Sequence, residues 1–279
     1  MTNLLLIELM KVFRRPRTYI SFVAIAVIVL LIQLALFLDG QTYLQFMLQT
    51  IDQSLQVEGS VLHGYFICFL ILQTLLIHVP LLIALVGGDA IAGEASMGTL
   101  RLLITRPPGR FELLMAKFMA TLVYTFLLLL WMAILSLLVS VLLFGTGDLM
   151  IFKSDAIVVL KEQDILWRYT AAFGFAALAM SCVAGLSFLL SVFADNSIGP
   201  IVTTMSIIIV FTILSTMDFP LFTAIKPYLF TSHILGWKGF FDDPVDLGSV
   251  LWSGTFLFLH IVFFTGTAFF VFSRKDILS

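Results

Sequence analysis

The stretch Arg14–Leu38 reads RRPRTYISFVAIAVIVLLIQLALFL, a short basic cluster followed by a long, predominantly apolar run. From Thr18 to Leu38 this run contains no charged residue. A bilayer core about 30 Å thick is crossed by roughly 20 apolar residues in a helix that rises about 1.5 Å per residue. The stretch therefore predicts a membrane-spanning helix that begins directly after a basic flank.

The rest of the chain repeats this apolar pattern. Apolar residues make up 61% of the 279 residues, charged residues 11%, and 28 residues are Phe, which is far from the usage of a soluble domain. Strict alternation of apolar and polar residues is absent, so helices are favoured over a barrel. We therefore predict an all-α integral membrane protein with six spans, approximately residues 18–38, 63–86, 113–144, 169–193, 198–216 and 251–272.

The positions of Lys and Arg predict the orientation of these spans. With the N-terminus in the cytoplasm, the segments on that side carry ten cations and the outer segments carry five. The first outer loop, residues 39–62, carries none, as the preference for positive charge on the inner side requires. Both termini, including the tail 273–279, are then cytoplasmic. No small-residue cleavage site follows Leu38, so the first span is expected to be retained.

Residues 1–17 have the pattern of an amphipathic helix at the membrane surface. The apolar positions share one helical face and the charged positions the opposite one: Leu5, Leu9, Val12 and Phe13 against Glu8, Lys11 and Arg15. Pro16 lacks an amide proton and suits the break before the first span. A plain basic flank is the alternative. In either case the cations are expected to anchor the chain at the membrane surface: Lys11, Arg14, Arg15 and Arg17.

Three segments between the spans on the outer side are polar or irregular. Residues 39–62 are rich in Gln, and residues 148–168 mix charged and apolar residues in a way that suggests a surface helix on the outer leaflet. Residues 217–250 are aromatic and punctuated by Pro. A re-entrant hairpin and an aromatic belt with ordinary loops both fit this third segment.

Small residues recur on the fourth span at intervals of four. Ala177, Ser181 and Gly185 share one helical face, with Gly174 nearby. Because small side chains let helix backbones approach closely inside a membrane, we predict tight packing of another helix here.

The loop between the second and third spans is the longest polar interruption on the cytoplasmic side. Asp89 is expected to cap a short helix from Ala90 to about Ile104, which Pro107 cannot continue. Glu94 and Arg101 lie seven residues apart and share a face of that helix, so they are expected to point away from the lipid. A partner protein could bind this charged face.

Two cations follow this loop at the start of the third span. Arg110 and Lys117 also lie seven residues apart. Their long side chains are expected to reach lipid phosphates and fix the depth of the helix.

The same loop resembles the signature of the membrane subunits of ABC-2 (type V) exporters. That signature has an acidic residue, Gly-Glu, Gly-Thr-Leu, Pro, Arg and Lys in this order. Its counterparts here are Asp89, Gly93, Glu94, Gly98, Thr99, Leu100, Pro107, Arg110 and Lys117. The opening of the loop is closest to the branch of the nitrous-oxide-reductase-maturation and gliding-associated permeases. The motif covers about 30 residues, whereas the layout of an amphipathic start and six spans extends over the whole chain.

The resemblance implies a permease subunit of the bacterial cytoplasmic membrane that is not itself an enzyme. A separate ATP-binding subunit would hold ATP and Mg and would push on a coupling helix that includes Asp89, Gly93, Glu94, Gly98, Thr99, Leu100 and Arg101. Two six-span subunits, expected to be identical, would form the pathway, with room for a periplasmic or accessory partner. The residues agree with this division, because neither glycine pair in the loop is followed by the Lys of a phosphate-binding loop.

Two other classes of protein remain as alternatives. One is a channel or secondary transporter that works without ATP, although the spans hold almost no ionisable residues and show no inverted repeat of broken helices. The other is an intramembrane serine hydrolase using Ser187 and His260. The apolar spans favour an amphiphilic or bulky cargo.

The remaining residue types indicate no further chemistry. The four His residues lack ligand spacing, so no metal or other cofactor is expected on this chain. Cys68 and Cys182 lie within predicted spans and are expected to be inert core residues. A net charge of −2 argues against a nucleic-acid partner.

Overall fold

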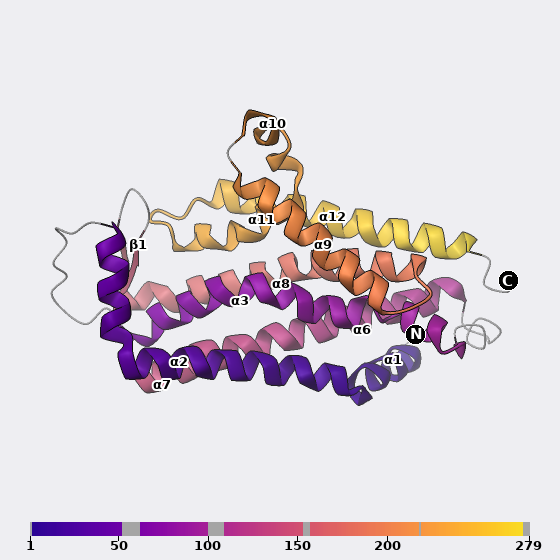
Figure 1. Cartoon of the computed structure of the whole chain (residues 1–279), viewed down its shortest axis with the longest axis horizontal. Coiled ribbons are helices and arrows are strands. Elements are labelled where there is room, and N and C mark those ends of the chain that lie inside the picture. Colours follow the sequence, from indigo (N-terminus) through magenta and orange to yellow (C-terminus); the bar gives the residue numbers. More distant parts are fainter. Residues whose placement is uncertain (1, 52–61, 100–108, 153–156, 218, 276–279) are drawn as a thin grey trace.

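The computed structural model describes residues 2–51, 62–99, 109–152, 157–217 and 219–275. Its long helices lie side by side along the long axis of the molecule (Figure 1). Six of them are long and apolar enough to cross a membrane, which confirms the expected number and makes the chain a multi-pass membrane protein: Pro16–Leu44, Gly64–Gly87, Arg110–Phe144, Glu162–Phe193, Ile198–Thr216 and Leu247–Arg274.

The elements follow one another in a simple order. The first half contains α1 (Thr2–Arg14), α2 (Pro16–Ile51), α3 (Gly64–Gly87), α4 (Ala92–Ser96), α6 (Arg110–Ala133), the π-helix η1 (Ile134–Val139) and α7 (Ser140–Phe144). The second half contains the strands β1 (Leu149–Phe152) and β2 (Ile157–Leu160), then α8 (Glu162–Phe193), α9 (Ile198–Thr216), α10 (Pro220–Thr223), η2 (Lys226–Tyr228), α11 (Phe230–Ile234), η3 (Leu235–Phe241) and α12 (Leu247–Arg274).

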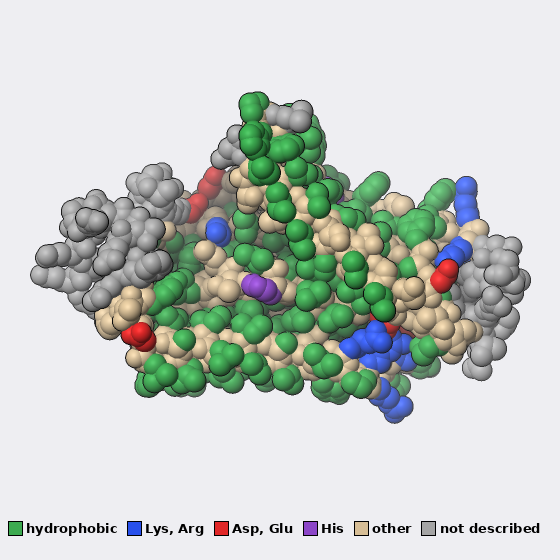
Figure 2. Space-filling view, in the orientation of Figure 1, with side chains coloured by type: hydrophobic (Ala, Val, Ile, Leu, Met, Phe, Trp, Pro, Cys, Tyr) green, Lys and Arg blue, Asp and Glu red, His purple; other side chains and the backbone are tan. Residues whose placement is uncertain are grey.

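Hydrophobic side chains cover most of the surface in Figure 2, and the largest group of Lys and Arg side chains on that face lies near the junction of α1 and α2. We call the end of the bundle formed by α1, residues 88–99 and the start of α6 the charged end. The long helix α2 begins at Pro16, where a residue without an amide proton is expected. Its backbone leaves helical geometry at Asp39, directly after the apolar run, and the helix then continues to Ile51.

Helix α8 forms the centre of the bundle. In the most apolar 18-residue stretch of α8, 78% of the residues are buried. In the corresponding stretches of α2, α9 and α12, fewer than 30% of the residues are buried. Gly185 faces α12, because a Cβ placed there would lie 3.6 Å from the Cβ of Phe264. Ala177 and Ser181 are half-buried, and Gly174 is exposed with no atom near its missing side chain. Close approach of α12 therefore occurs at the Gly185 end of the small-residue stripe.

The segment before α8 contains a β-hairpin, so the surface helix expected over residues 148–168 is wrong. Strands β1 and β2 pair antiparallel, with Leu149 opposite Leu160. Leu149 and Leu160 are buried, while Ile157 and Val159 are exposed, as in a strand that covers the core with one face. The run of β-branched residues from Ile157 to Val159 suits a strand better than a helix.

The aromatic segment before α12 divides into two parts. The part from Phe230 to Phe241 packs against α8 and α12, and the rings of Phe230, Trp237 and Phe241 are at most 1% exposed. The preceding helix α10 projects away from the bundle (Figure 1). The second part is therefore integrated into the helical core and is more than an ordinary loop.

A polar contact between helices holds the π-helix η1 in place. Gln33, which is 1% exposed in the middle of α2, donates from Nε2 to the Leu135 carbonyl at 3.1 Å and to the Ser140 hydroxyl at 2.9 Å. A π-turn displaces backbone carbonyls from the regular helical pattern and therefore needs such partners. Gln33 thus joins α2 to the point where α6 passes into α7.

Replacing Gln33 is expected to destabilise the protein. The change Gln33→Leu removes both hydrogen bonds and lowers the unfolding free energy by about 1 kcal/mol, the size typical of polar contacts between membrane helices. Thermal unfolding in detergent measures the loss, with Leu34→Ala as the control because Leu34 is 53% exposed on the same helix. A Gln33→Leu variant as stable as the native chain would contradict this role.

Candidate functional site at the charged end of the bundle

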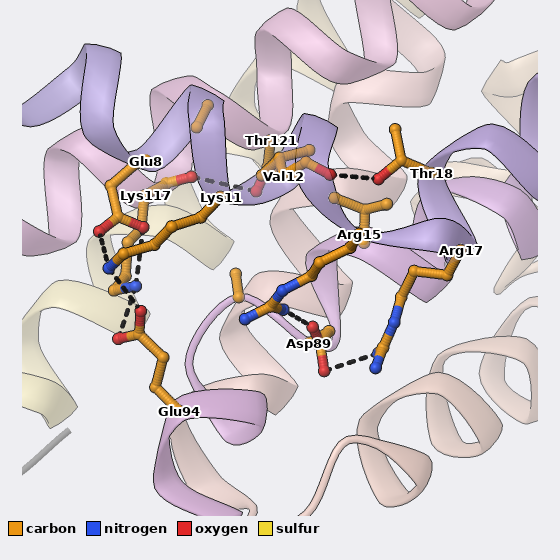
Figure 3. Close-up of a pocket in the computed structure, with 13 residues that line it drawn as sticks. Glu8, Lys11, Val12, Arg15, Arg17, Thr18, Asp89, Glu94, Lys117 and Thr121 are labelled. Atoms are coloured by element: carbon orange, nitrogen blue, oxygen red, sulfur yellow. Dashed lines mark hydrogen bonds and ion pairs between the residues drawn. The ribbon is translucent and has the colours of Figure 1, made fainter. Parts of the chain in front are cut away.

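Four charged side chains from three separate segments meet at the charged end (Figure 3). Glu8 and Lys11 come from α1, Glu94 from α4, and Lys117 from the first two turns of α6. We call these four residues the four-charge network. It joins segments that lie more than 80 residues apart in the sequence.

The pairs in the four-charge network alternate in sign. Lys11 Nζ lies 2.6 Å from Glu8 Oε1 and 2.8 Å from Glu94 Oε1. Lys117 Nζ lies 2.9 Å from Glu8 Oε2 and 2.7 Å from Glu94 Oε2. Each ammonium therefore bridges both carboxylates, and each carboxylate receives both ammoniums. Glu8, Glu94 and Lys117 are buried, with at most 4% of each residue exposed, and Lys11 is half-buried.

This arrangement corrects three expectations about the charged residues. Glu94 was expected on a surface that a partner binds, but it is 3% exposed and paired inside the protein. Lys117 was expected to reach lipid phosphates, but it is equally buried. α1 was expected to be an amphipathic helix at the membrane surface, but its charged residue Glu8 is buried against α6 while Leu6, Ile7 and Met10 are exposed. The residues of opposite charge that pair with Glu94 and Lys117 come from other segments of the chain, so the spacing within one segment could not predict them.

A second cluster forms around Asp89 at the end of α3. Its carboxylate is paired with Arg15, with Arg17 at 2.7 Å, and with the Ser197 hydroxyl, which donates to it. Asp89 was expected to cap the following helix, but the first residue before α4 is Ile91 and its side chain makes no cap. Arg15 and Arg17 were expected to anchor at the membrane surface, whereas here they hold the loop. We call these four residues the Asp89 cluster.

Glycine at position 93 makes room for this cluster. A Cβ placed on Gly93 would lie 2.7 Å from Asp89 Cγ, closer than real Cβ contacts allow. Gly87 has a similar role against α8, because its missing Cβ would lie 3.3 Å from the Cβ of Ser187 and closer still to the hydroxyl. The loop therefore reaches its position only because these two residues lack side chains.

Ser191 on α8 is a further residue of this region, and the sequence analysis did not identify it. Its hydroxyl accepts the backbone N–H groups of Ile91 at 3.0 Å and Ala92 at 2.9 Å, and it donates to the Gly88 carbonyl at 2.8 Å. These are groups at the start of α4 that have no partner within the short helix. Nothing in the sequence marks Ser191, because serines are common in packed membrane helices.

The helix expected from Ala90 to about Ile104 is described only as far as Thr99, and within that part it begins at Ala92 and is interrupted after Ser96. α4 covers Ala92–Ser96, and Gly98 adopts a left-handed backbone conformation with φ of 68°. Within the described part of this loop, Ser96, Met97, Gly98 and Thr99 are exposed, and Met97 is 60% exposed. Leu100, Arg101 and Pro107 lie outside the described residues.

The other expected anchoring residues have different environments. Arg110 donates to the backbone carbonyls of Ser273 at 3.2 Å and Lys275 at 3.1 Å, so it holds the end of α12 and is not directed to lipid. Lys275 in turn donates to the Val192 carbonyl at 2.8 Å, at the end of α8. Arg14 is exposed.

The cavity between the two clusters is too small for a cargo molecule. Its volume is about 20 Å³, and it is lined by side chains of both clusters together with Val12, Thr18 and Thr121. A space of this size holds about one water molecule. The space between the two clusters is therefore filled almost completely by their own side chains.

The residues considered for hydrolase chemistry are not brought together. Ser187 donates to the Ala184 carbonyl at 3.1 Å and packs against Gly87. His260 bonds through Nδ1 to the Phe256 carbonyl at 2.9 Å and lies among the rings of Phe230 and Phe264. Within the described part of the chain, each of the two side chains has its own surroundings.

The charges of Glu94 and Lys11 are stabilised by their partners. Burial alone would raise the pKa of the Glu94 carboxyl, but the ammoniums of Lys117 and Lys11 outweigh it and hold the pKa below its ordinary 4.5. Burial would likewise lower the pKa of Lys11, but hydrogen bonds to Glu8 and Glu94 hold it above its ordinary 10.5. Both groups are therefore charged throughout the physiological range.

Comparison with known proteins identifies a family for this chain. The chain belongs to the family described as "Protein of unknown function (DUF2705)", whose model matches residues 22–278. It is also similar to "Uncharacterized protein YhcI" of Bacillus subtilis (strain 168), with 26% identity over 200 residues. That match covers 69% of this chain and 63% of the relative, so it extends over less than two thirds of the relative's length.

The burial of Glu94 leads to a testable expectation. Glu94→Ala leaves the buried ammonium of Lys117 with one partner fewer, which costs about 3–5 kcal/mol of unfolding free energy when a buried pair is broken. Removing both partners in a Glu94→Gln, Lys117→Met variant is expected to cost less, because Glu8 and Lys11 still pair with each other. Thermal unfolding in detergent and the yield of monodisperse protein measure both variants.

Arg14→Ala is the matched control, because Arg14 is exposed at the same end of the molecule. It is expected to change stability by no more than about 0.5 kcal/mol. If Glu94→Ala were as stable as Arg14→Ala, the four-charge network would not hold the loop in place.

The contribution of Glu94 to stability has a defined pH dependence. Because the pKa of Glu94 is lowered on folding, its contribution is fully present above the unfolded value near 4.5 and is lost as the pH falls towards the lower folded value. The stability difference between the native chain and Glu94→Gln should therefore be constant from about pH 6 to 8 and shrink below about pH 4.5. A difference that changes between pH 6 and 8 would contradict this assignment.

Proposed function

We propose that this chain is the membrane-spanning permease subunit of an ABC exporter, driven by a separate ATP-binding subunit. The observation that carries the proposal is the attachment of the loop after α3 to α1, to α6 and to the junction of α1 and α2. Glu94 ties this loop to α1 through Lys11 and to α6 through Lys117. Asp89 ties it to the junction of α1 and α2 through Arg15 and Arg17.

Such a loop is suited to receiving force. A force on the loop would be transmitted to α1 and α6 through the buried ion pairs and to α8 through Ser191. These contacts are direct, so no flexible segment lies between the loop and the helices. Buried pairs resist separation because a single unpaired charge in this environment costs several kcal/mol. The same reasoning is consistent with the resemblance of Asp89, Gly93, Glu94, Gly98 and Thr99 to the ABC-2 signature.

The contact with the ATP-binding subunit is proposed for the exposed tip of the loop. Glu94 and Asp89 are occupied inside the protein, so among the described residues of the loop a partner would contact Ser96, Met97, Gly98 and Thr99. Met97 is an exposed apolar side chain at this tip and supplies the kind of anchor that protein interfaces favour. The partner would hold ATP and Mg, and this chain would supply no catalytic group.

The orientation belongs to the same proposal. The charged end, with its excess of Lys and Arg, would face the cytoplasm of a bacterial cell, and the end with the β-hairpin would face outwards. A second permease subunit, identical in the simplest case, would complete the transporter.

Capture of the ATP-binding subunit tests this function. The tagged chain, solubilised from native membranes, is expected to retain an ATP-binding-cassette subunit that mass spectrometry identifies. Met97→Asp should reduce this recovery at least tenfold, because it places a charge in an apolar contact. Ile157→Asp, which changes an exposed apolar residue at the opposite end, is the control and should leave recovery unchanged.

Two results would overturn the proposal. One is a pure preparation from native membranes with no ATPase subunit. The other is equal recovery with Met97→Asp and Ile157→Asp, which would remove the loop tip from the contact.

A further inference from the structure

The junction of α1 and α2 carries an exposed cation. Arg14, Arg15 and Arg17 lie next to one another around Pro16. Arg15 and Arg17 point toward Asp89 and pair with it (Figure 3). Arg14 is exposed and has no hydrogen bond, ion pair or ring contact among the described residues. Its guanidinium therefore keeps its five N–H donors available.

The other described cations at the charged end each have a partner in the protein. Arg274 lies over the ring of Phe270, at 4.2 Å from its centre. The rest pair with a carboxylate or with a backbone carbonyl: Lys11, Arg15, Arg17, Arg110, Lys117 and Lys275. Within the described part of this end, Arg14 is thus the one cation without a partner.

An apolar groove begins at Arg14 and continues along α2. Its volume is about 790 Å³, and beyond Arg14 it is lined by residues of α2 alone: Pro16, Tyr19, Ile20, Val23, Ala24, Val27 and Ile28. These residues recur at intervals of three and four, the spacing of one helical face. Ala24 lies one turn from both Ile20 and Ile28, so its small side chain leaves space between two larger ones.

The groove has about the length of one leaflet of a bilayer. From Pro16 to Ile28, α2 rises by about 18 Å, and half of the hydrocarbon core is about 15 Å thick. Arg14 and Tyr19, both exposed, lie at the end of the groove where the apolar run begins, and Arg and Tyr are common at the depth of the headgroups. The groove therefore lies beside the acyl chains of one leaflet, with a cation at the level of their headgroups.

The charge of this region favours an anion. The Asp89 cluster has two guanidinium groups and one carboxylate, and Arg14 adds a further positive charge. The largest group of Lys and Arg side chains in Figure 2 lies near this junction. The N-terminus of α2 contributes a partial positive charge, because the peptide dipoles of the helix are aligned. A zwitterionic headgroup has no net negative charge to balance this excess.

We propose that the junction of α1 and α2 is a binding site for an anionic phospholipid of the adjoining leaflet. The lipid phosphate accepts hydrogen bonds from the Arg14 guanidinium, whose planar fork matches phosphate oxygens. An acyl chain of the lipid occupies the groove along α2. Because Arg15 and Arg17 hold the loop after α3 from the same junction, the bound lipid also restrains the Asp89 cluster. This inference goes beyond the proposed function and does not rest on it.

Lipid binding by the purified chain tests the site. The chain in phospholipid-free detergent is titrated with dioleoyl phosphatidylglycerol or with dioleoyl phosphatidylcholine, and native mass spectrometry and thermal unfolding follow the binding. Phosphatidylglycerol, which is anionic, is expected to bind about fivefold more tightly, the effect of one basic residue near an anionic headgroup. It is also expected to raise the unfolding temperature. Equal binding of the two lipids would overturn the proposal.

The role of the cation is tested by Arg14→Ala. This variant is expected to bind phosphatidylglycerol about fivefold more weakly than the native chain. Arg274→Ala is the matched control, because Arg274 is an exposed cation at the same end of the molecule. Without added lipid, Arg14→Ala should be as stable as the native chain, so its weaker binding would not reflect misfolding. Equal binding by Arg14→Ala and Arg274→Ala contradicts the assignment.

The role of the groove is tested by Ala24→Phe, which fills it and leaves Arg14 in place. This variant is expected to weaken binding at least as much as Arg14→Ala. Leu30→Phe is the control, because Leu30 is 49% exposed on the same helix and does not line the groove. If Ala24→Phe binds the lipid as Leu30→Phe does, the acyl chain lies elsewhere and the proposal fails. Neither ATP nor another subunit is present, so this failure would leave the proposed coupling intact.

Discussion

The buried ion pairs at the charged end are the constraint on which the local structure depends. Burying charges is costly unless each has partners of the opposite sign, and here each ammonium lies within 2.9 Å of two carboxylates. Such a network adds little stability compared with apolar packing of the same volume. Its effect is on specificity, because any rotation of α1 about its axis would separate Glu8 and Lys11 from their partners and leave charges buried alone.

The close packing around this network depends on residues without large side chains. Gly87 and Gly93 admit the neighbouring chain, and Ser191 satisfies the backbone at the start of α4 with a single hydroxyl. The loop after α3 is consequently held from three directions: by α1, by α6 and by α8. Among the described residues of this loop, those from Ser96 to Thr99 are exposed. A partner at this tip would therefore act on a rigid unit and not on a separate flexible helix.

The helical membrane architecture could be predicted from the sequence because it follows from one-dimensional properties. Length and apolar content identify the six spans, and Pro16 marks the boundary between α1 and α2. The environments of Glu94 and Lys117 could not be predicted in this way. A charged residue in a polar loop looks exposed until its partner is known, and Glu8 lies 109 residues from Lys117. The hairpin of β1 and β2 was missed for a different reason, because short strands of β-branched residues resemble fragments of apolar helix.

The balance of charge in the four-charge network bears on membrane voltage. Two carboxylates and two ammoniums sum to zero, so movement of the network along the membrane normal carries no net charge through the transmembrane field. The Asp89 cluster, with two guanidinium groups and one carboxylate, carries one net positive charge. A displacement of the four-charge network alone would thus be insensitive to the membrane potential, whereas one that also displaced Asp89, Arg15 and Arg17 would feel it.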